Sequence, residues 1–205
     1  VKLQDPQTGP AITLQALYDT RDLAIRVEWA DPCQNIYMNA WNWDGTSFFK
    51  TGEEDRVIFQ FPMENDPEFA SKGCGAVCHN QESNPEKWYM AANSSGFRYD
   101  QWHWKATRTN PVNQADDKWL GMRADPSNTE SAHYGDTLDG GGEKLNQNES
   151  RNGPQYMNGE DPTSPYIFAG QEVPVDVSIL QPGAIIPGYI LSPMVGSRGD
   201  ISAWG

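Results

Sequence analysis

Short segments that alternate apolar and polar residues constrain the fold of this chain most strongly. Residues 12–18 (ITLQALY) and 23–29 (LAIRVEW) alternate in this way and are rich in β-branched and aromatic types, which predicts two strands. The four residues between them, DTRD, have the composition of a turn, so the pair predicts a β-hairpin. Residues 56–61 (RVIFQF) predict a third strand, which ends at Pro62 because proline cannot donate to a sheet ladder.

A fourth strand is predicted within residues 97–108 (FRYDQWHWKATR), where aromatic side chains recur. Successive side chains of a strand point to opposite faces of the sheet. Trp102 and Trp104 are therefore expected on one face and His103 on the other. Their position beside a histidine makes the two indoles candidates for cofactor packing, with ordinary core packing as the equal alternative.

The remaining segments predict more loops and strands but no substantial helices. Residues 65–96 indicate a long loop with a short helix near the cysteines, and residues 109–164 indicate a long polar excursion. Residues 174–180 and 184–191 predict two further strands. With 19 glycines and 15 prolines among 205 residues, the chain is loop-rich. We expect one all-β domain over residues 1–205, an antiparallel β-sandwich with long loops.

The charge of the chain disfavours two kinds of partner. Its formal net charge is −13, from 28 acidic and 15 basic residues. Nucleic-acid binding depends on contacts between cations and phosphates, so it is disfavoured, as is binding to an anionic membrane surface. No apolar run reaches the roughly 18 residues of a membrane-spanning helix.

Residues 73–80 read GCGAVCHN and gather two thiols and an imidazole. In covalently attached haem, two cysteines add to the vinyl groups and the histidine after the second cysteine ligates the iron. Cys74, Cys78 and His79 can perform these roles, although three residues lie between the cysteines where two are common. The small residues of the gap would let the loop lie close to a porphyrin.

Two other interpretations of this cluster remain open. A structural zinc site would use the same three side chains and take Cys33 or His133 as its fourth ligand. The cysteines could instead be buried thiols or a local disulfide beside an unrelated histidine. A haem iron would need a sixth ligand for electron transfer. The candidates for this ligand are His103, His133, Met90, Met157, Met194 and Cys33.

Five stretches of the chain resemble one protein family over residues 23 to 203. They are LAIRVEWADP, DRVIFQFP, GCGAVCH, DQWHWKATRTNPVNQADDKWL and IPGYILSPMVGSRGDISA. On these motifs the chain resembles the haem-binding proteins related to the γ subunit of ethylbenzene dehydrogenase, the cytochrome c-552/dimethyl sulfoxide reductase-like haem-binding family. The resemblance implies a β-sandwich that holds one haem near one end, in this chain through a haem-binding insertion.

The combination of GCGAVCH and WHWK resembles the c-type branch of this family. The resemblance implies one covalent haem c, with Cys74 and Cys78 as the attachment thiols and His79 as the proximal iron ligand. It favours His103 as the distal ligand. The γ subunits themselves hold haem b through methionine and lysine, and this chain departs from that pattern.

The resemblance implies a monohaem c-type cytochrome that transfers electrons and is not itself an enzyme. The alternatives are a non-catalytic haem subunit of a larger molybdenum oxidoreductase and a link in an extracellular cytochrome assembly. A zinc-stabilised binding module that presents Trp41 and Trp43 to sugars is a further alternative. The expected partners are redox proteins, such as other cytochromes or an iron–sulfur or molybdenum enzyme. Because haem c is attached outside the cytoplasm, we expect a periplasmic or extracellular protein.

The resemblance also bears on the C-terminal end of the sandwich. Family members continue past the GSRGDISA block with a tryptophan-containing strand and a closing hairpin. The comparison therefore implies C-terminal strands beyond Gly205, or an open sheet edge. An open edge could be covered by a partner chain in a homo- or hetero-oligomer.

Overall fold

The computed structural model describes residues 2–3, 11–77, 90–92, 94–122, 133–135 and 141–205. The chain forms two compact units, Val1–Gln34 and Asn35–Gly205. The expectation of one domain over residues 1–205 stays a prediction.

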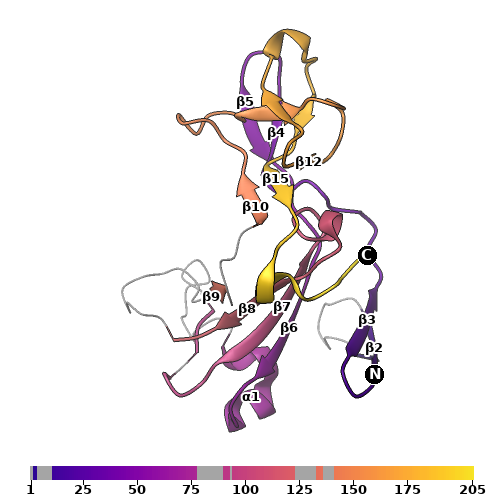
Figure 1. The fold of residues 1–205 in the computed structure, drawn as a ribbon, viewed down its shortest axis with the longest axis vertical. Helices are drawn as coiled ribbons and strands as arrows, with labels where there is room; N and C mark the ends of the chain where they lie inside the picture. Colours follow the sequence, from indigo (N-terminus) through magenta and orange to yellow (C-terminus); the bar gives the residue numbers. More distant parts are fainter. Residues whose placement is uncertain (1, 4–10, 78–89, 93, 123–132, 136–140) are drawn as a thin grey trace. The chain divides into compact units, whose positions relative to one another are not determined.

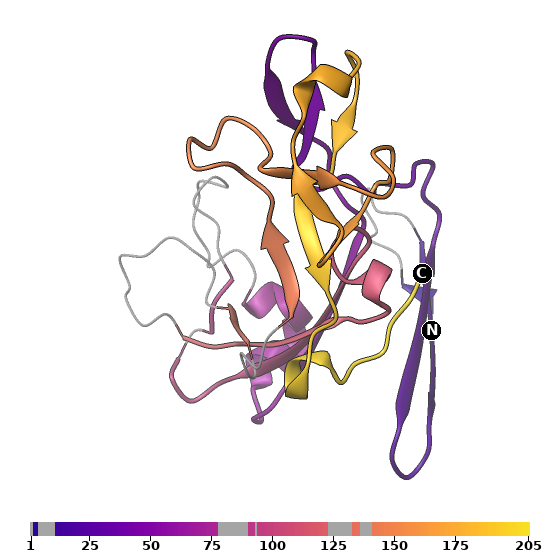
Figure 2. The same ribbon diagram turned by 45° about the horizontal axis from the view of Figure 1, so that its top comes forward.

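The first unit is a three-stranded antiparallel sheet built on a long hairpin (Figure 2). Its strands are β1 (Lys2–Leu3), β2 (Ile12–Tyr18) and β3 (Leu23–Trp29). The bounds of β2 and β3 confirm the predicted hairpin. In its turn, Oδ1 of Asp19 accepts hydrogen bonds of 2.8 Å from the backbone N–H groups of Arg21 and Asp22, so a local side chain closes the loop.

The second unit contains four small sheets (Figure 1). With strands given in their order across each sheet, the first sheet contains β14 (Ile185–Ile186), β4 (Ala40–Trp43) and β5 (Phe48–Thr51), and the second contains β6 (Arg56–Pro62), β7 (Tyr99–Lys105), β8 (Asp116–Leu120) and β9 (His133–Gly135). The third contains β10 (Gly142–Leu145), β15 (Tyr189–Ser192) and β12 (Ile167–Phe168). The fourth pairs β11 (Tyr156–Asn158) with β13 (Glu172–Pro174). Among the described pairs, β12 and β15 alone run parallel. These sheets confirm the predicted all-β, mainly antiparallel class.

The sheet β6-β7-β8-β9 has two faces of different chemistry, because opposite residues of paired strands share a face. We call one the histidine face: Ile58, Gln60, Tyr99, Gln101, His103, Lys105, Asp116, Lys118, Leu120 and His133. We call the other the aromatic face: Val57, Phe59, Phe61, Trp102, Trp104, Trp119 and Tyr134. The separation of His103 from the two tryptophans of β7 is therefore confirmed.

A short helical segment follows β6 and leads to the cysteine cluster. Helix α1 (Pro67–Lys72) begins after Asp66, whose carboxylate accepts a 2.9 Å hydrogen bond from the N–H of Glu68, and it has proline in its first turn. It ends at Gly73, which has a positive φ of 58°. A 3-10 helix, Gly73–Ala76, continues the chain. The predicted short helix near the cysteines is confirmed.

Two apolar clusters stabilise the second unit. The first joins β4, β11, β12, β14 and β15 through the following buried residues: Trp41, Met157, Ile167, Ile186 and Ile190. The second places the 3-10 helix against β7 and β8 through Ala76, Val77, Ala92, Tyr99 and Leu120. This second cluster fixes the residues that directly precede Cys78 against one end of the histidine face.

The later part of the chain departs from the sequence prediction. Residues 174–180 do not form a strand, because β13 ends at Pro174 and Asp176 caps a 3-10 helix, Val177–Ile179, by accepting from the N–H of Ser178. The segment 184–191 is divided into β14 and β15 around Pro187. Residues 109–164, expected to be a loop, supply β8 to β11.

Candidate functional site

The cysteine segment lies at the Tyr99 end of the histidine face. Cys74 is exposed in the 3-10 helix, whereas Val77 is 1% exposed and packs with Tyr99 and Leu120. The carbonyl of Val77 also accepts a 3.2 Å hydrogen bond from the N–H of Ala91. Cys78 and His79 lie outside the described residues.

His103 is a half-buried imidazole in the middle of the histidine face. Its Nε2 atom is inaccessible to solvent and makes no hydrogen bond. Burial, together with the nearby charges of Lys105 and Lys118, lowers the pKa of His103 to about 2. The ring is therefore neutral at physiological pH, and a neutral imidazole is the form that ligates a metal.

His133 lies on the same face, on the edge strand β9 and opposite Leu120. Its Nδ1 lies 2.6 Å from Oε1 of Gln101, and with Gln101 as acceptor this nitrogen carries the proton. Burial also lowers the pKa of His133. The Nε2 atom of this neutral ring is then unprotonated, which makes His133 a second candidate ligand.

A row of three polar side chains crosses the histidine face between these two imidazoles. Gln60 lies opposite Gln101, and Gln101 lies opposite Lys118. Gln101 is 1% exposed, and its Nε2 has no hydrogen-bond partner. Both the Nε2 and the Oε1 of Gln60 are also buried without partners. Buried amides are normally hydrogen-bonded, so this row indicates a polar group that the described residues do not supply.

The sequence analysis did not select this row. The alternation within 56–61 and 97–108 places Gln60 and Gln101 opposite the aromatic residues of their strands, but it does not reveal that they are buried. The register between the strands, which brings the two amides and Lys118 together, comes only from the structure.

An ion cluster closes the other end of the histidine face. Nζ of Lys105 lies 2.8 Å from Oδ2 of Asp116 and 3.1 Å from Oε1 of Glu143, and Nζ of Lys118 lies 2.7 Å from the same Asp116 oxygen. Lys105 and Asp116 are almost completely buried. The pairing compensates the cost of burying these charges and holds Asp116 beside His103, its partner in the strand register.

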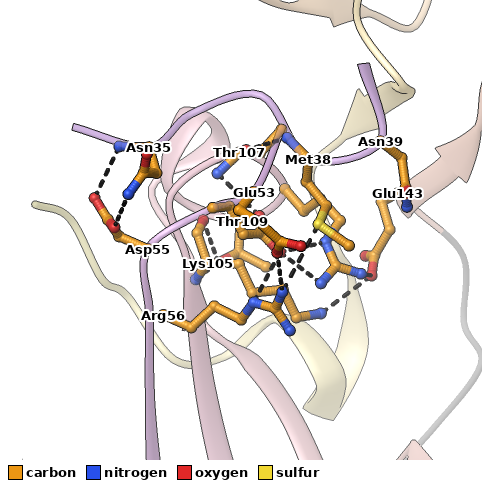
Figure 3. A network of polar contacts seen from close by, with 12 residues as sticks. Asn35, Met38, Asn39, Glu53, Asp55, Arg56, Lys105, Thr107, Thr109 and Glu143 are labelled. Carbon is orange, nitrogen blue, oxygen red and sulfur yellow. Dashed lines mark hydrogen bonds and ion pairs between the residues drawn. The ribbon is translucent and has the colours of Figure 1, made fainter. Parts of the chain in front are cut away.

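Lys105 and Glu143 belong to a polar network (Figure 3). This network continues into a buried carboxylate at Glu54. Arg108 binds Glu54 through Nη2 at 2.6 Å and Nε at 2.8 Å, and the N–H of Thr107 donates to its second oxygen at 3.1 Å. Arg108 also lies 3.5 Å from Glu143, which connects Glu54 to Lys105. This network fixes the end of β7 that follows His103.

The two tryptophans of β7 lie away from His103. Trp102 packs against Phe61 with ring centroids 4.9 Å apart, and the indole N–H of Trp104 donates to Asn110 at 3.2 Å. Both belong to the aromatic face. A planar cofactor bound to His103 on the histidine face would be separated from Trp102 and Trp104 by the thickness of the sheet.

The other candidate ligands lie in different surroundings. Met90 packs against the cluster that contains Val77, close to the cysteine segment. Met157 is 3% exposed inside the other apolar cluster, and Met194 is equally buried. Cys33 is an exposed thiol of the first unit. Among the described residues, no group of three or more histidine, cysteine or acidic side chains is arranged to hold a metal ion.

The structure also tests the tryptophans of the sugar-binding alternative. Trp41 is 2% exposed, and its indole N–H donates a 2.6 Å hydrogen bond to the carbonyl of Asn146. The expectation that Trp41 forms an exposed platform is therefore wrong, because the side chain is part of the core.

The residues of the histidine face fit a haem. A haem offers an iron that accepts the lone pair of an imidazole, and it carries two carboxylates that accept hydrogen bonds. The unpartnered Nε2 of His103 matches the first requirement, and the amides of Gln60 and Gln101 match the second. The buried cluster of Val77, Tyr99 and Leu120, which anchors the cysteine segment, lies beside them.

Comparisons with known proteins agree with this chemistry. A family model described as ethylbenzene dehydrogenase matches residues 3–205. No curated protein and no solved structure matched the chain. In the described part of the chain, no helix has the length and apolar character required to cross a membrane. Because the family match spans nearly every residue, the chain belongs to the ethylbenzene dehydrogenase family.

Proposed function

We propose that this protein is an electron-transfer protein that binds one haem on the histidine face and serves an oxidoreductase. The observation that carries the proposal is the buried Nε2 of His103, which is neutral and without a hydrogen-bond partner. It lies on the face against which Val77 packs, so the cysteine segment and the free imidazole meet the same side of one sheet.

The haem we propose is a covalent haem c. Cys74 and Cys78 would form the two thioether bonds, and His79 would be the proximal ligand. His103 would be the distal ligand, with His133 and Met90 as the alternatives nearest to the cysteine segment. When bound, the iron supplies one-electron redox chemistry, and its two axial ligands and their surroundings set the potential. The pocket we propose excludes Trp102 and Trp104, which belong to the aromatic face.

Several chain residues would serve the electron-transfer role without touching the iron. Asp116 and Lys118 flank His103 on β8 and place fixed charges beside the ligand. Lys105 and Glu143 hold Asp116 in position. Buried charges of this kind change a redox potential because the iron gains or loses one charge when it is oxidised or reduced.

Membership of the ethylbenzene dehydrogenase family supports an oxidoreductase as the partner. We propose that the chain is a non-catalytic haem subunit of such an enzyme, a molybdenum enzyme by the family resemblance. A separate monohaem cytochrome, or a link in an extracellular cytochrome assembly, is the second candidate, because covalent attachment is typical of exported cytochromes. Both candidates place the protein in the periplasm or outside the cell.

The test is the intact mass and visible absorbance of the denatured native protein. A mass increased by one haem, with a Soret band retained after denaturation, is expected. The Cys74→Ala/Cys78→Ala variant should lose this covalent haem, whereas Cys33→Ala should keep it. Haem that dissociates on denaturation would show that the cofactor is haem b and not haem c. Protein that never contains haem would overturn the proposal.

A further inference from the structure

Four unpartnered polar atoms lie on neighbouring positions of the histidine face. One is Nε2 of His103, and the other three belong to Gln60 and Gln101, which face each other across β6 and β7. Each of these atoms is inaccessible to solvent. Leaving a buried polar group without a hydrogen bond is costly, so three such amide atoms in one place point to a polar group that binds there.

The chemistry of the row selects the group that it would bind. Gln60 and Gln101 each offer amide N–H donors, and Lys118 adds an ammonium group to the same row. Nζ of Lys118 already binds Asp116 at 2.7 Å, but an ammonium group has three protons to donate. A row of two amide donors and one cation matches a carboxylate. The buried Oε1 of Gln60 can accept from a protonated carboxyl or from a water bound to it.

The position of the row selects the source of the carboxylate. Gln101 is two residues from His103 on the same face of β7, so the two side chains are neighbours along the strand. On the other side of the row, the buried cluster of Tyr99, Leu120 and Val77 anchors the residues that directly precede Cys78. A group that meets an imidazole and a carboxylate-binding row beside the cysteine segment has the chemistry of a porphyrin with propionate side chains.

We infer that the row Gln60–Gln101–Lys118 holds a propionate carboxylate of the haem, an inference that rests on the proposed function. The two amides take the carboxylate into the interior, and Lys118 balances its charge. The contact of Gln101 Oε1 with Nδ1 of His133 orients the amide, so that its Nε2 is available for the propionate. Gln60 and Gln101 are thus positioning residues for the porphyrin rather than iron ligands.

The experiment compares the haem-loaded protein with its Gln60→Leu and Gln101→Leu variants, with Gln181→Leu at an exposed position as the matched control. Resonance Raman spectroscopy of the loaded protein reports the bending band of the haem propionates. This band is expected to shift in both row variants and to stay unchanged in the control. The haem-to-protein ratio after denaturation is measured in parallel.

Thermal unfolding gives an independent readout, because the change in midpoint caused by each row variant should have opposite signs without and with haem. In the Cys74→Ala/Cys78→Ala background, measured after any non-covalent haem has been extracted, replacing an unpartnered amide with leucine should raise the midpoint, since it removes a buried group without a hydrogen bond. In the loaded protein the same replacement should lower the midpoint, because it removes a bond to the propionate. The control should change neither.

The outcomes separate the two proposals. Normal haem content with an unchanged propionate band, and the same sign of stability change with and without haem, would mean that only water occupies the row. That result overturns the inference and leaves the proposed function in place. A native protein without haem overturns the proposed function and the inference together.

Discussion

The hydroxyl of Tyr99 donates a 2.5 Å hydrogen bond to Oδ2 of Asp66, and both residues are buried. The other carboxylate oxygen of Asp66 accepts from the N–H of Glu68 and so caps helix α1. One carboxylate therefore joins β7 to the helix that leads directly to Cys74. The position of the cysteine segment on the histidine face depends on this contact as well as on Val77.

Replacing Tyr99 with phenylalanine should loosen this connection. The hydroxyl lowers the pKa of Asp66, and without it a buried carboxylate loses a partner. We expect the thermal midpoint to fall by about 2–4 °C, the change typical of losing one good hydrogen bond in a domain of this size. We also expect a smaller fraction of the protein to acquire haem. Calorimetry and the haem-to-protein ratio measure these effects. Tyr18→Phe, at an exposed position, should change neither.

The identity of the distal ligand can be tested with a pair of histidine variants. His103→Ala should retain covalent haem but convert its absorption spectrum from low-spin to high-spin, because one axial nitrogen is lost. His133→Ala is the matched control and should leave the low-spin spectrum in place. If His133→Ala alone produces the high-spin spectrum, the ligand is His133. If neither variant changes it, Met90 is the next candidate.

Two lysine–carboxylate pairs of almost equal length should differ greatly in their effect on stability. Lys105 lies 2.8 Å from Asp116 in the interior, and Lys72 lies 2.7 Å from Glu68 at the surface. Lys105→Met removes the buried cation that Asp116 and Glu143 share and should reduce the free energy of unfolding by about 3–5 kcal/mol. Lys72→Met should reduce it by less than about 0.5 kcal/mol. Denaturant titration measures both. Equal losses would show that the interior cluster does not hold the face together.

Glu143 should make the stability depend on pH in the acid range. Burial acts to raise the pKa of Glu143, but the charge and hydrogen bond of Lys105, with help from Lys118, lower it on balance below its usual 4.5. The unfolded state then binds a proton more readily than the native state. The contribution of Glu143 to the free energy of unfolding is complete above pH 4.5. It is lost as the pH falls through the lower pKa of the native state, by up to about 1.4 kcal/mol per pH unit.

The measurement for Glu143 is the free energy of unfolding above and below pH 4.5. Glu143→Gln should be less stable than the parent at neutral pH and should lose less stability on acidification. An unchanged acid dependence in Glu143→Gln would assign the effect to other carboxylates. The exposed variant Glu149→Gln provides the control.

The sequence was informative where local rules decide the structure. Alternation and turn chemistry are properties of neighbouring residues, so they gave the β2–β3 hairpin and the separation of His103 from Trp102 correctly. The row Gln60–Gln101–Lys118 depends instead on pairing between strands that are distant in the chain, which no local pattern encodes. The strand predicted over 174–180 failed because Asp176 caps a helical turn that the apolar residues alone do not reveal.

The pairing of β4 with β14 has a consequence for the order of events during synthesis. Asn42 pairs with Ile185, and the N–H of Trp43 donates to the carbonyl of Ala184 at 2.9 Å. Because the chain is synthesised from its N-terminus, β4 cannot pair with β14 until almost the whole unit has been made. Contacts between such distant residues also form slowly. The cysteine segment leaves the ribosome much earlier, so it is complete before β4 can pair with β14.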